Sequence, residues 1–124
     1  MPLVRRRTDA REMDCLATDI VGDLVYVTGA EAVARVDPTL SAKMPAVGVI
    51  VKKPASTRAL VQFSGAVTVL GALTPGLRYF VGATGQPAAA PPAGPGRRYA
   101  QPVGIALAPS VLMLNMQDPT VLVG

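Results

Sequence analysis

The residue types that carry most enzyme chemistry are scarce in this sequence. Histidine is absent and Cys15 is the one cysteine, so the usual general base near neutral pH and the usual zinc ligands are missing. Carboxylates remain, and all but one of them fall within residues 1–37. They are Asp9, Glu12, Asp14, Asp19, Asp23, Glu31, Asp37 and Asp118. Turn formation and solubility explain these acids more simply than a catalytic pair does.

Short catalytic and phosphate-binding motifs are also missing. The sequence contains no GxGxxG, GxxxxGK[ST] or GxSxG pattern. A single cysteine cannot form an intrachain disulfide, and we interpret Cys15 as a small buried hydrophobe. We therefore expect no enzymatic activity and no catalytic, cofactor-binding or metal site.

Positive charge is concentrated beyond the first third of the chain. The formal net charge is +4, and residues 38–117 hold seven cations and no acid. A run of three arginines in the N-terminal arm could touch nucleic acid, but three acids follow it and the sequence has only five aromatic residues to stack on bases. We expect no nucleic-acid partner. An acidic protein surface fits the charge better.

Three segments are candidates for contacts with another protein chain. The first is the basic arm, the second ends the Pro- and Gly-rich stretch 84–102, and the third is an apolar run in the C-terminal tail. The candidate residues are Arg5, Arg6, Arg7, Arg97, Arg98, Tyr99, Val121, Leu122 and Val123. A solvated loop whose tyrosine ring lies along the surface is the alternative interpretation of residues 97–99.

Nothing in the sequence indicates a membrane protein. No run approaches the roughly 18–20 apolar residues that cross a bilayer. The basic start MPLVRRRTDAREMD leads into charges instead of an apolar stretch, so we expect no secretory signal there. We expect no membrane partner.

The positions of apolar residues predict short β-strands. Period-two runs fall at 20–28, 47–52, 58–64, 66–70, 77–81, 103–107 and 111–116. Alternation places Leu77, Tyr79 and Val81 on one face, and Val103, Ile105 and Leu107 likewise on one face. Single helical turns are expected only at 8–13 and 38–43. The 24 Gly and Pro residues argue against long helices.

Two blocks recur in the same order along the chain. GDLVYVTG at 22–29 aligns with PGLRYFVG at 75–82, and PAVGVI at 45–50 aligns with QPVGIA at 101–106. Duplication explains this better than chance similarity between Val- and Gly-rich strands. We predict an all-β fold, a small β-barrel or sandwich built from two similar halves, about 20–64 and 73–116. The β domain spans 19–116, with an extended N-terminal arm at 1–18 and a C-terminal tail at 117–124.

A β domain of this composition has few large side chains with which to cover its own apolar surfaces. Large aromatic side chains usually dominate a small core, and here smaller aliphatic residues must fill it. The strand at 111–116 is apolar on both faces, so an isolated sheet would leave one of them wet. We therefore expect an oligomer.

The series VGDLVYVTG, MPAVGVIVKK, ALVQFSG, LTPGLRYFVG, QPVGIAL and VLMLN resembles short β-rich structural proteins of tailed bacteriophages. These are the capsid decoration (cement) proteins and the related head-fibre and tail-fibre modules. The resemblance covers roughly residues 19–116 and rests on strand-and-turn patterns.

The resemblance implies homotrimers on the outer surface of the virion capsid, made in the bacterial host cytoplasm. Their termini would reach onto neighbouring subunits of the major capsid protein, and their role would be to stabilise the shell. No functional residue carries over from the family. A receptor- or glycan-binding fibre module is the alternative, although residues 38–117 offer no carboxylate for a sugar.

Overall fold

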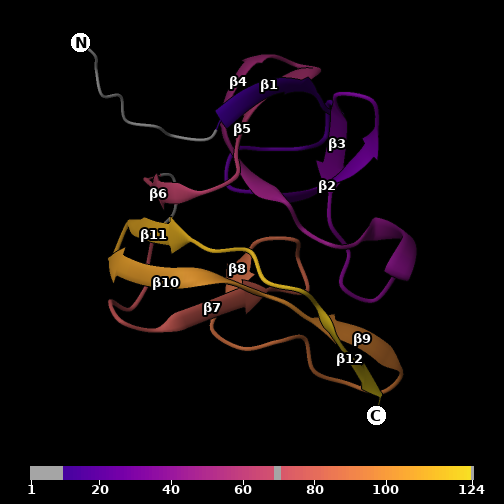
Figure 1. Ribbon diagram of the computed structural model, residues 1–124, viewed down its shortest axis with the longest axis vertical. Coiled ribbons are helices and arrows are strands. Elements are labelled where there is room, and N and C mark those ends of the chain that lie inside the picture. The colour runs from indigo at the N-terminus through magenta and orange to yellow at the C-terminus, as the bar shows by residue number, and fades with distance from the viewer. Residues whose placement is uncertain (1–9, 69–70, 124) are drawn as a thin grey trace, which may run out of the picture.

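The computed structural model describes residues 10–68 and 71–123, and nearly all of its regular structure is β (Figure 1). The strands are β1 (Ala10–Asp14), β2 (Leu24–Gly29), β3 (Ala32–Arg35), β4 (Gly48–Ala55), β5 (Arg58–Gln62), β6 (Gly65–Val67), β7 (Arg78–Val81), β8 (Pro87–Ala88), β9 (Arg97–Ala100), β10 (Pro102–Ala108), β11 (Val111–Leu114) and β12 (Thr120–Val123). One 3₁₀ turn, η1 (Ser41–Lys43), falls where a helical turn was expected. The all-β prediction is confirmed. Among the described residues, none forms a helix with the length and hydropathy of a membrane span.

The strands form one closed barrel, one open sheet and one two-stranded ribbon. The barrel has the order β1-β3-β2-β4-β5 and closes where Asp14 of β1 pairs with Ala32 of β3. The open sheet has the order β6-β11-β10-β7-β8, and β9 pairs with β12 in the ribbon. In Figure 1 the barrel lies above the open sheet, and the ribbon extends to one side, toward the C-terminal end.

The barrel and the open sheet correspond strand for strand. The order β3-β2-β4-β5-β1 matches β8-β7-β10-β11-β6, with β9 and β12 as additions in the second half. Of the repeated glycines, Gly29 and Gly82 differ: a Cβ on Gly29 would meet nothing within 4 Å, whereas one on Gly82 would lie 2.6 Å from the carbonyl oxygen of Gln86. Gly48 and Gly104 occupy equivalent sites: a Cβ on Gly48 would lie 2.6 Å from the carbonyl oxygen of Gln62 on β5, and one on Gly104 would collide with the carbonyl oxygen of Met113 on β11. The close strand approach at both sites explains why glycine recurs there. The strand order and these two glycines support the predicted duplication. The alignment of 22–29 with 75–82 is one residue out of register in the structure, because Gly48 stands opposite Val25 whereas Gly104 stands opposite Tyr79, not opposite Arg78.

Two apolar clusters hold the fold together. One fills the barrel and consists of Met13, Cys15, Val25, Val33, Ile50, Ala59 and Val61. The other joins the outside of the barrel to the inner face of the open sheet. It includes Leu24 and Val49 from the barrel, and Val81, Ala106 and Leu112 from the sheet. The second half therefore covers one face of the first half.

The N-terminal part of the β domain differs from the prediction. Residues 10–13, expected as a helical turn within an arm spanning 1–18, belong to β1, which pairs along the length of β5. The strand expected at 20–28 begins only at Leu24. Gly22 adopts a φ of 98°, and the turn before β2 is closed by a hydrogen bond from the Ile20 N–H to Asp23. The barrel thus includes chain that the period-two pattern did not identify.

Two predicted faces also differ from the structure. A register shift between Pro102 and Gly104 turns Val103 into the core, while Ile105 and Leu107 are 40% and 54% exposed. In the strand predicted at 77–81, Tyr79 and Val81 are buried as expected. Leu77 precedes β7 and is 40% exposed.

Candidate interaction surfaces

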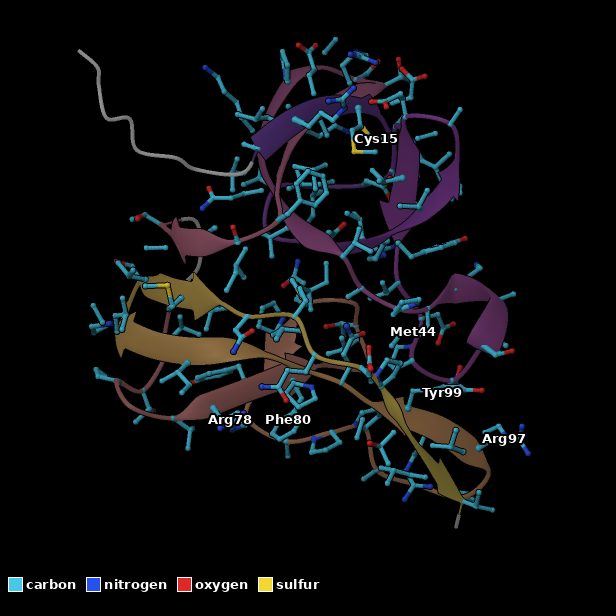
Figure 2. All side chains as sticks on the ribbon, viewed as in Figure 1. Cys15, Met44, Arg78, Phe80, Arg97 and Tyr99 are labelled. Carbon is cyan, nitrogen blue, oxygen red and sulfur yellow. The ribbon has the colours of Figure 1, made fainter. Side chains whose placement is uncertain are left out.

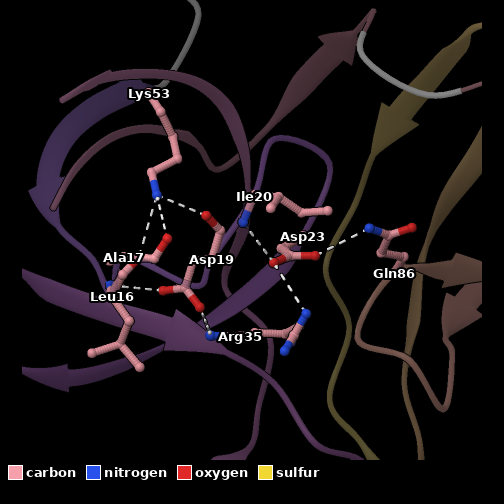
Figure 3. A network of polar contacts seen from close by, with 8 residues as sticks. All are labelled: Leu16, Ala17, Asp19, Ile20, Asp23, Arg35, Lys53 and Gln86. Atoms are coloured by element: carbon pink, nitrogen blue, oxygen red, sulfur yellow. Dashed lines mark hydrogen bonds and ion pairs between the residues drawn. The ribbon is translucent and has the colours of Figure 1, made fainter. Parts of the chain in front are cut away.

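Two buried carboxylates organise the loop between β1 and β2 (Figure 3). Asp19 accepts hydrogen bonds from the backbone N–H groups of Leu16 (2.9 Å) and Arg35 (3.3 Å). Asp23 accepts from the Ile20 N–H (2.9 Å) and the Gln86 amide (3.1 Å). Both carboxylates are at most 2% exposed. These contacts fit the predicted turn role of the acids.

The Lys53 side chain reaches the same loop from β4. Its Nζ donates to the backbone carbonyl oxygens of Leu16 (3.3 Å), Ala17 (3.4 Å) and Asp19 (2.7 Å). Figure 3 shows these contacts converging on the ammonium group. The loop between β1 and β2 is therefore held by its own carboxylates, those of Asp19 and Asp23, and by the Lys53 ammonium group from β4.

A polar groove of about 560 Å³ lies beside this network, lined in part by Tyr26, Arg35, Asp37 and Lys43. The Asp37 carboxylate accepts hydrogen bonds from the backbone N–H (2.9 Å) and hydroxyl (2.6 Å) of Thr39, and these bonds lower the pKa of Asp37. Across the described parts of the chain, no group of three His, Cys, Asp or Glu residues could hold a metal ion.

Cys15 lies inside the barrel (Figure 2). The residue is 6% exposed, and burial raises the pKa of its thiol above the ordinary value. This matches the interpretation of Cys15 as a small core residue.

The ribbon brings together two of the segments predicted to contact other chains. Residues 97–100 pair antiparallel with 120–123, so Val123 stands opposite Arg97, Leu122 opposite Arg98 and Val121 opposite Tyr99. The predicted arginines 5–7 lie outside the described residues. The sequence could not reveal this pairing because the two segments are separated by β10 and β11.

Only part of this set faces solvent. Arg98 is engaged within its own loop, where it donates to the carbonyl oxygens of Pro92 (2.8 Å) and Gly96 (3.0 Å). Tyr99 is 9% exposed, whereas Val121 and Val123 are 48% and 76% exposed. The exposed Arg97 side chain points outward near the end of the ribbon (Figure 2) and makes no hydrogen bond or ion pair with the described residues.

A second surface was predicted only in part: the sequence indicated an exposed apolar face at 111–116 but not the residues of the neighbouring strands that share it. On the outer face of the open sheet, Ile105 stands between its cross-strand neighbours Arg78 and Met113, with Leu107 further along β10. Ile105, Leu107 and Met113 are each at least 40% exposed, and a hollow of about 130 Å³ lies between Arg78, Ile105 and Met113. We call these four residues the outer face. Val49, which aligns with Ile105 in the repeat, is fully buried in the shared core.

Comparison with known proteins does not place the chain in a family. No family model, no curated protein and no solved structure matches it.

Proposed function

We propose that this protein is a structural component of a tailed-phage virion. It binds the outside of the capsid as a homo-oligomer, a trimer, and stabilises the shell by bridging major capsid subunits. The observation that carries the proposal is the bare outer face. The equivalent face of the barrel is covered by the second half of the same chain, whereas Ile105, Leu107 and Met113 have no cover within the described residues. A neighbouring subunit would remove this apolar surface from water.

The distribution of charge supports an acidic partner. Glu31 pairs with Arg11 (2.6 Å), and Asp14 pairs with Arg58 (2.6 Å). The acids Asp19, Asp23 and Asp37 are engaged in turns, as described above. By contrast, Lys52, Arg78 and Arg97 are exposed and form no ion pair in the described ranges. Asp118 is exposed and likewise forms no ion pair in the described ranges, but these three unpaired cations outnumber it. Unpaired cations attract carboxylates and raise association rates.

Co-sedimentation with purified particles tests the proposal. The full chain is mixed with empty expanded phage shells and, separately, with host envelope fractions. Saturable binding to shells alone is expected. Binding to envelope fractions alone would contradict the capsid role and favour the receptor- or glycan-binding alternative.

The contribution of the N-terminal arginines is tested by deletion. Removal of Met1–Thr8 takes away Arg5, Arg6 and Arg7 but leaves the whole of β1, so we expect weaker shell binding with an unchanged unfolding midpoint. Removal through Asp14 is the contrasting variant, because it also deletes the strand that closes the barrel and should prevent folding. If the shorter deletion binds shells as tightly as the full chain, the arm is not an anchor.

A further inference from the structure

One edge of the ribbon lacks the usual protection of an edge strand. β12 (TVLV) contains no charged residue, no proline and no register shift against β9. Natural edge strands normally carry one of these features, because an open edge pairs readily with other chains. The opposite edge of the ribbon is covered, since the Tyr99 N–H donates to the carbonyl oxygen of Pro38 (2.8 Å).

That single hydrogen bond fixes which backbone groups of β12 are free. In an antiparallel pair, residues alternate between those bonded across the pair and those whose N–H and C=O point away from it. The N–H of Tyr99 points to Pro38, so Tyr99 and Val121 are not bonded to each other. Arg98 with Leu122, and Ala100 with Thr120, are the bonded pairs. The backbone groups of Val121 and Val123 therefore face outward.

The side chains at the same positions are also accessible. Val121 and Val123 are 48% and 76% exposed, and Arg97 lies directly across from Val123 on the same face of the ribbon. A strand added beyond β12 would pair with both valines, and its side chains would stand beside them. The arginine is long enough to lie across Val123 toward a carboxylate on that strand.

We propose that the outer edge of β12 accepts an extended strand from another protein chain, one in which apolar residues alternate with polar residues that include a carboxylate. The backbone bonds to Val121 and Val123 provide affinity, and Arg97 selects for negative charge. A strand that carries lysine instead fits less well, because its cations would lie beside Arg97, which stands opposite Val123. The inference does not depend on the virion role.

Titration with synthetic peptides tests the proposal on the full chain. One peptide alternates valine with glutamate and threonine, and a second has lysine in place of each glutamate. The glutamate peptide is expected to bind, and the lysine peptide to bind more weakly. The substitution Arg97→Gln should remove this preference. Equal binding of the two peptides by the wild-type chain, or no binding of either, would overturn the proposal.

Two substitutions at one position separate backbone pairing from side-chain contact. Val121→Pro removes the outward N–H but none of the bonds to β9, and should weaken binding of the glutamate peptide at least about fivefold, the effect of one lost hydrogen bond. Val121→Thr keeps both the N–H and the β-branched shape, and should stay within about twofold. Unchanged binding by Val121→Pro would overturn the proposal.

Amide hydrogen exchange gives a readout that does not rely on the proline variant folding. In the wild-type chain, the amides of Val121 and Val123 should exchange rapidly and become protected when the glutamate peptide binds. The Leu122 amide should be protected already. Protection that does not change at either valine would contradict strand addition. Peptide binding without shell binding would support strand addition and count against the virion role.

Discussion

The Lys53 side chain stabilises the fold by binding backbone carbonyl oxygens, where a surface lysine would ordinarily pair with a carboxylate. Its ammonium group binds three carbonyl oxygens of the loop between β1 and β2, at 2.7–3.4 Å. The adjacent Lys52 is exposed and has no such contacts. The sequence KK gives no sign of this difference, because the two side chains point to opposite faces of β4.

We predict that Lys53→Met lowers the free energy of unfolding by about 1–3 kcal/mol, because it removes the Lys53 donor from the carbonyl oxygens of Ala17 and Asp19, whereas that of Leu16 still accepts from the Asp19 N–H. Urea denaturation measures the change. Lys52→Met is the matched control and should change stability by no more than about 0.5 kcal/mol. Equal effects of the two substitutions would show that the loop does not depend on Lys53.

Asp37 gives a pH-dependent prediction. Hydrogen bonds from Thr39 hold the pKa of Asp37 below its ordinary value of 3.8 in the folded protein. A carboxylate with a lowered folded pKa stabilises the fold above its unfolded pKa, and this stabilisation is lost as the pH falls through the folded value. Asp37→Asn should therefore be less stable than the wild type at neutral pH. The difference should shrink below the ordinary value of 3.8, as measured by thermal unfolding. A difference that does not depend on pH would contradict this role.

Among the elements, the Pro-rich stretch before β9 is held in place by Arg98 and not by the adjacent Arg97. Arg98 binds the carbonyl oxygens of Pro92 and Gly96, and Arg97 binds none. Arg98→Ala should therefore make this stretch more susceptible to proteolysis and lower stability by about 1–3 kcal/mol. Arg97→Ala should leave both properties unchanged. If the two variants are cleaved at the same rate, Arg98 does not hold the loop.

Period-two alternation predicted most of the longer strands but not all elements of the barrel. β5 was found because Ala59 and Val61 face the core in strict alternation. β1 was not, because only Met13 of its five residues is buried. The ribbon was also missed: the arginines of β9 resemble a solvated loop, and its partner β12 lies in the predicted tail. The faces of β10 could not be predicted, because the register shift near Val103 interrupts the alternation.

At the scale of the whole molecule, the duplication explains both the core and the exposed surface. Two similar sheets pack so that the inner face of the second covers the outside of the first. This arrangement buries Val49 and leaves the aligned Ile105 at the surface. The sequence predicted the two halves, and the covering subunit that it also predicted stays a prediction. It did not predict which face would be bare, because that depends on how the halves pack on each other.

We propose that the outer face associates with another copy of the chain, and sedimentation equilibrium measures this association. Ile105→Glu places a charge at the centre of the outer face. Val27→Glu is the matched control, since Val27 is exposed to a similar extent (52%) on β2 of the barrel. We predict trimers for the wild type and for Val27→Glu, and folded monomers for Ile105→Glu. A monomeric wild type, or an Ile105→Glu variant with the mass of the wild-type oligomer, would show that the outer face does not hold an oligomer together.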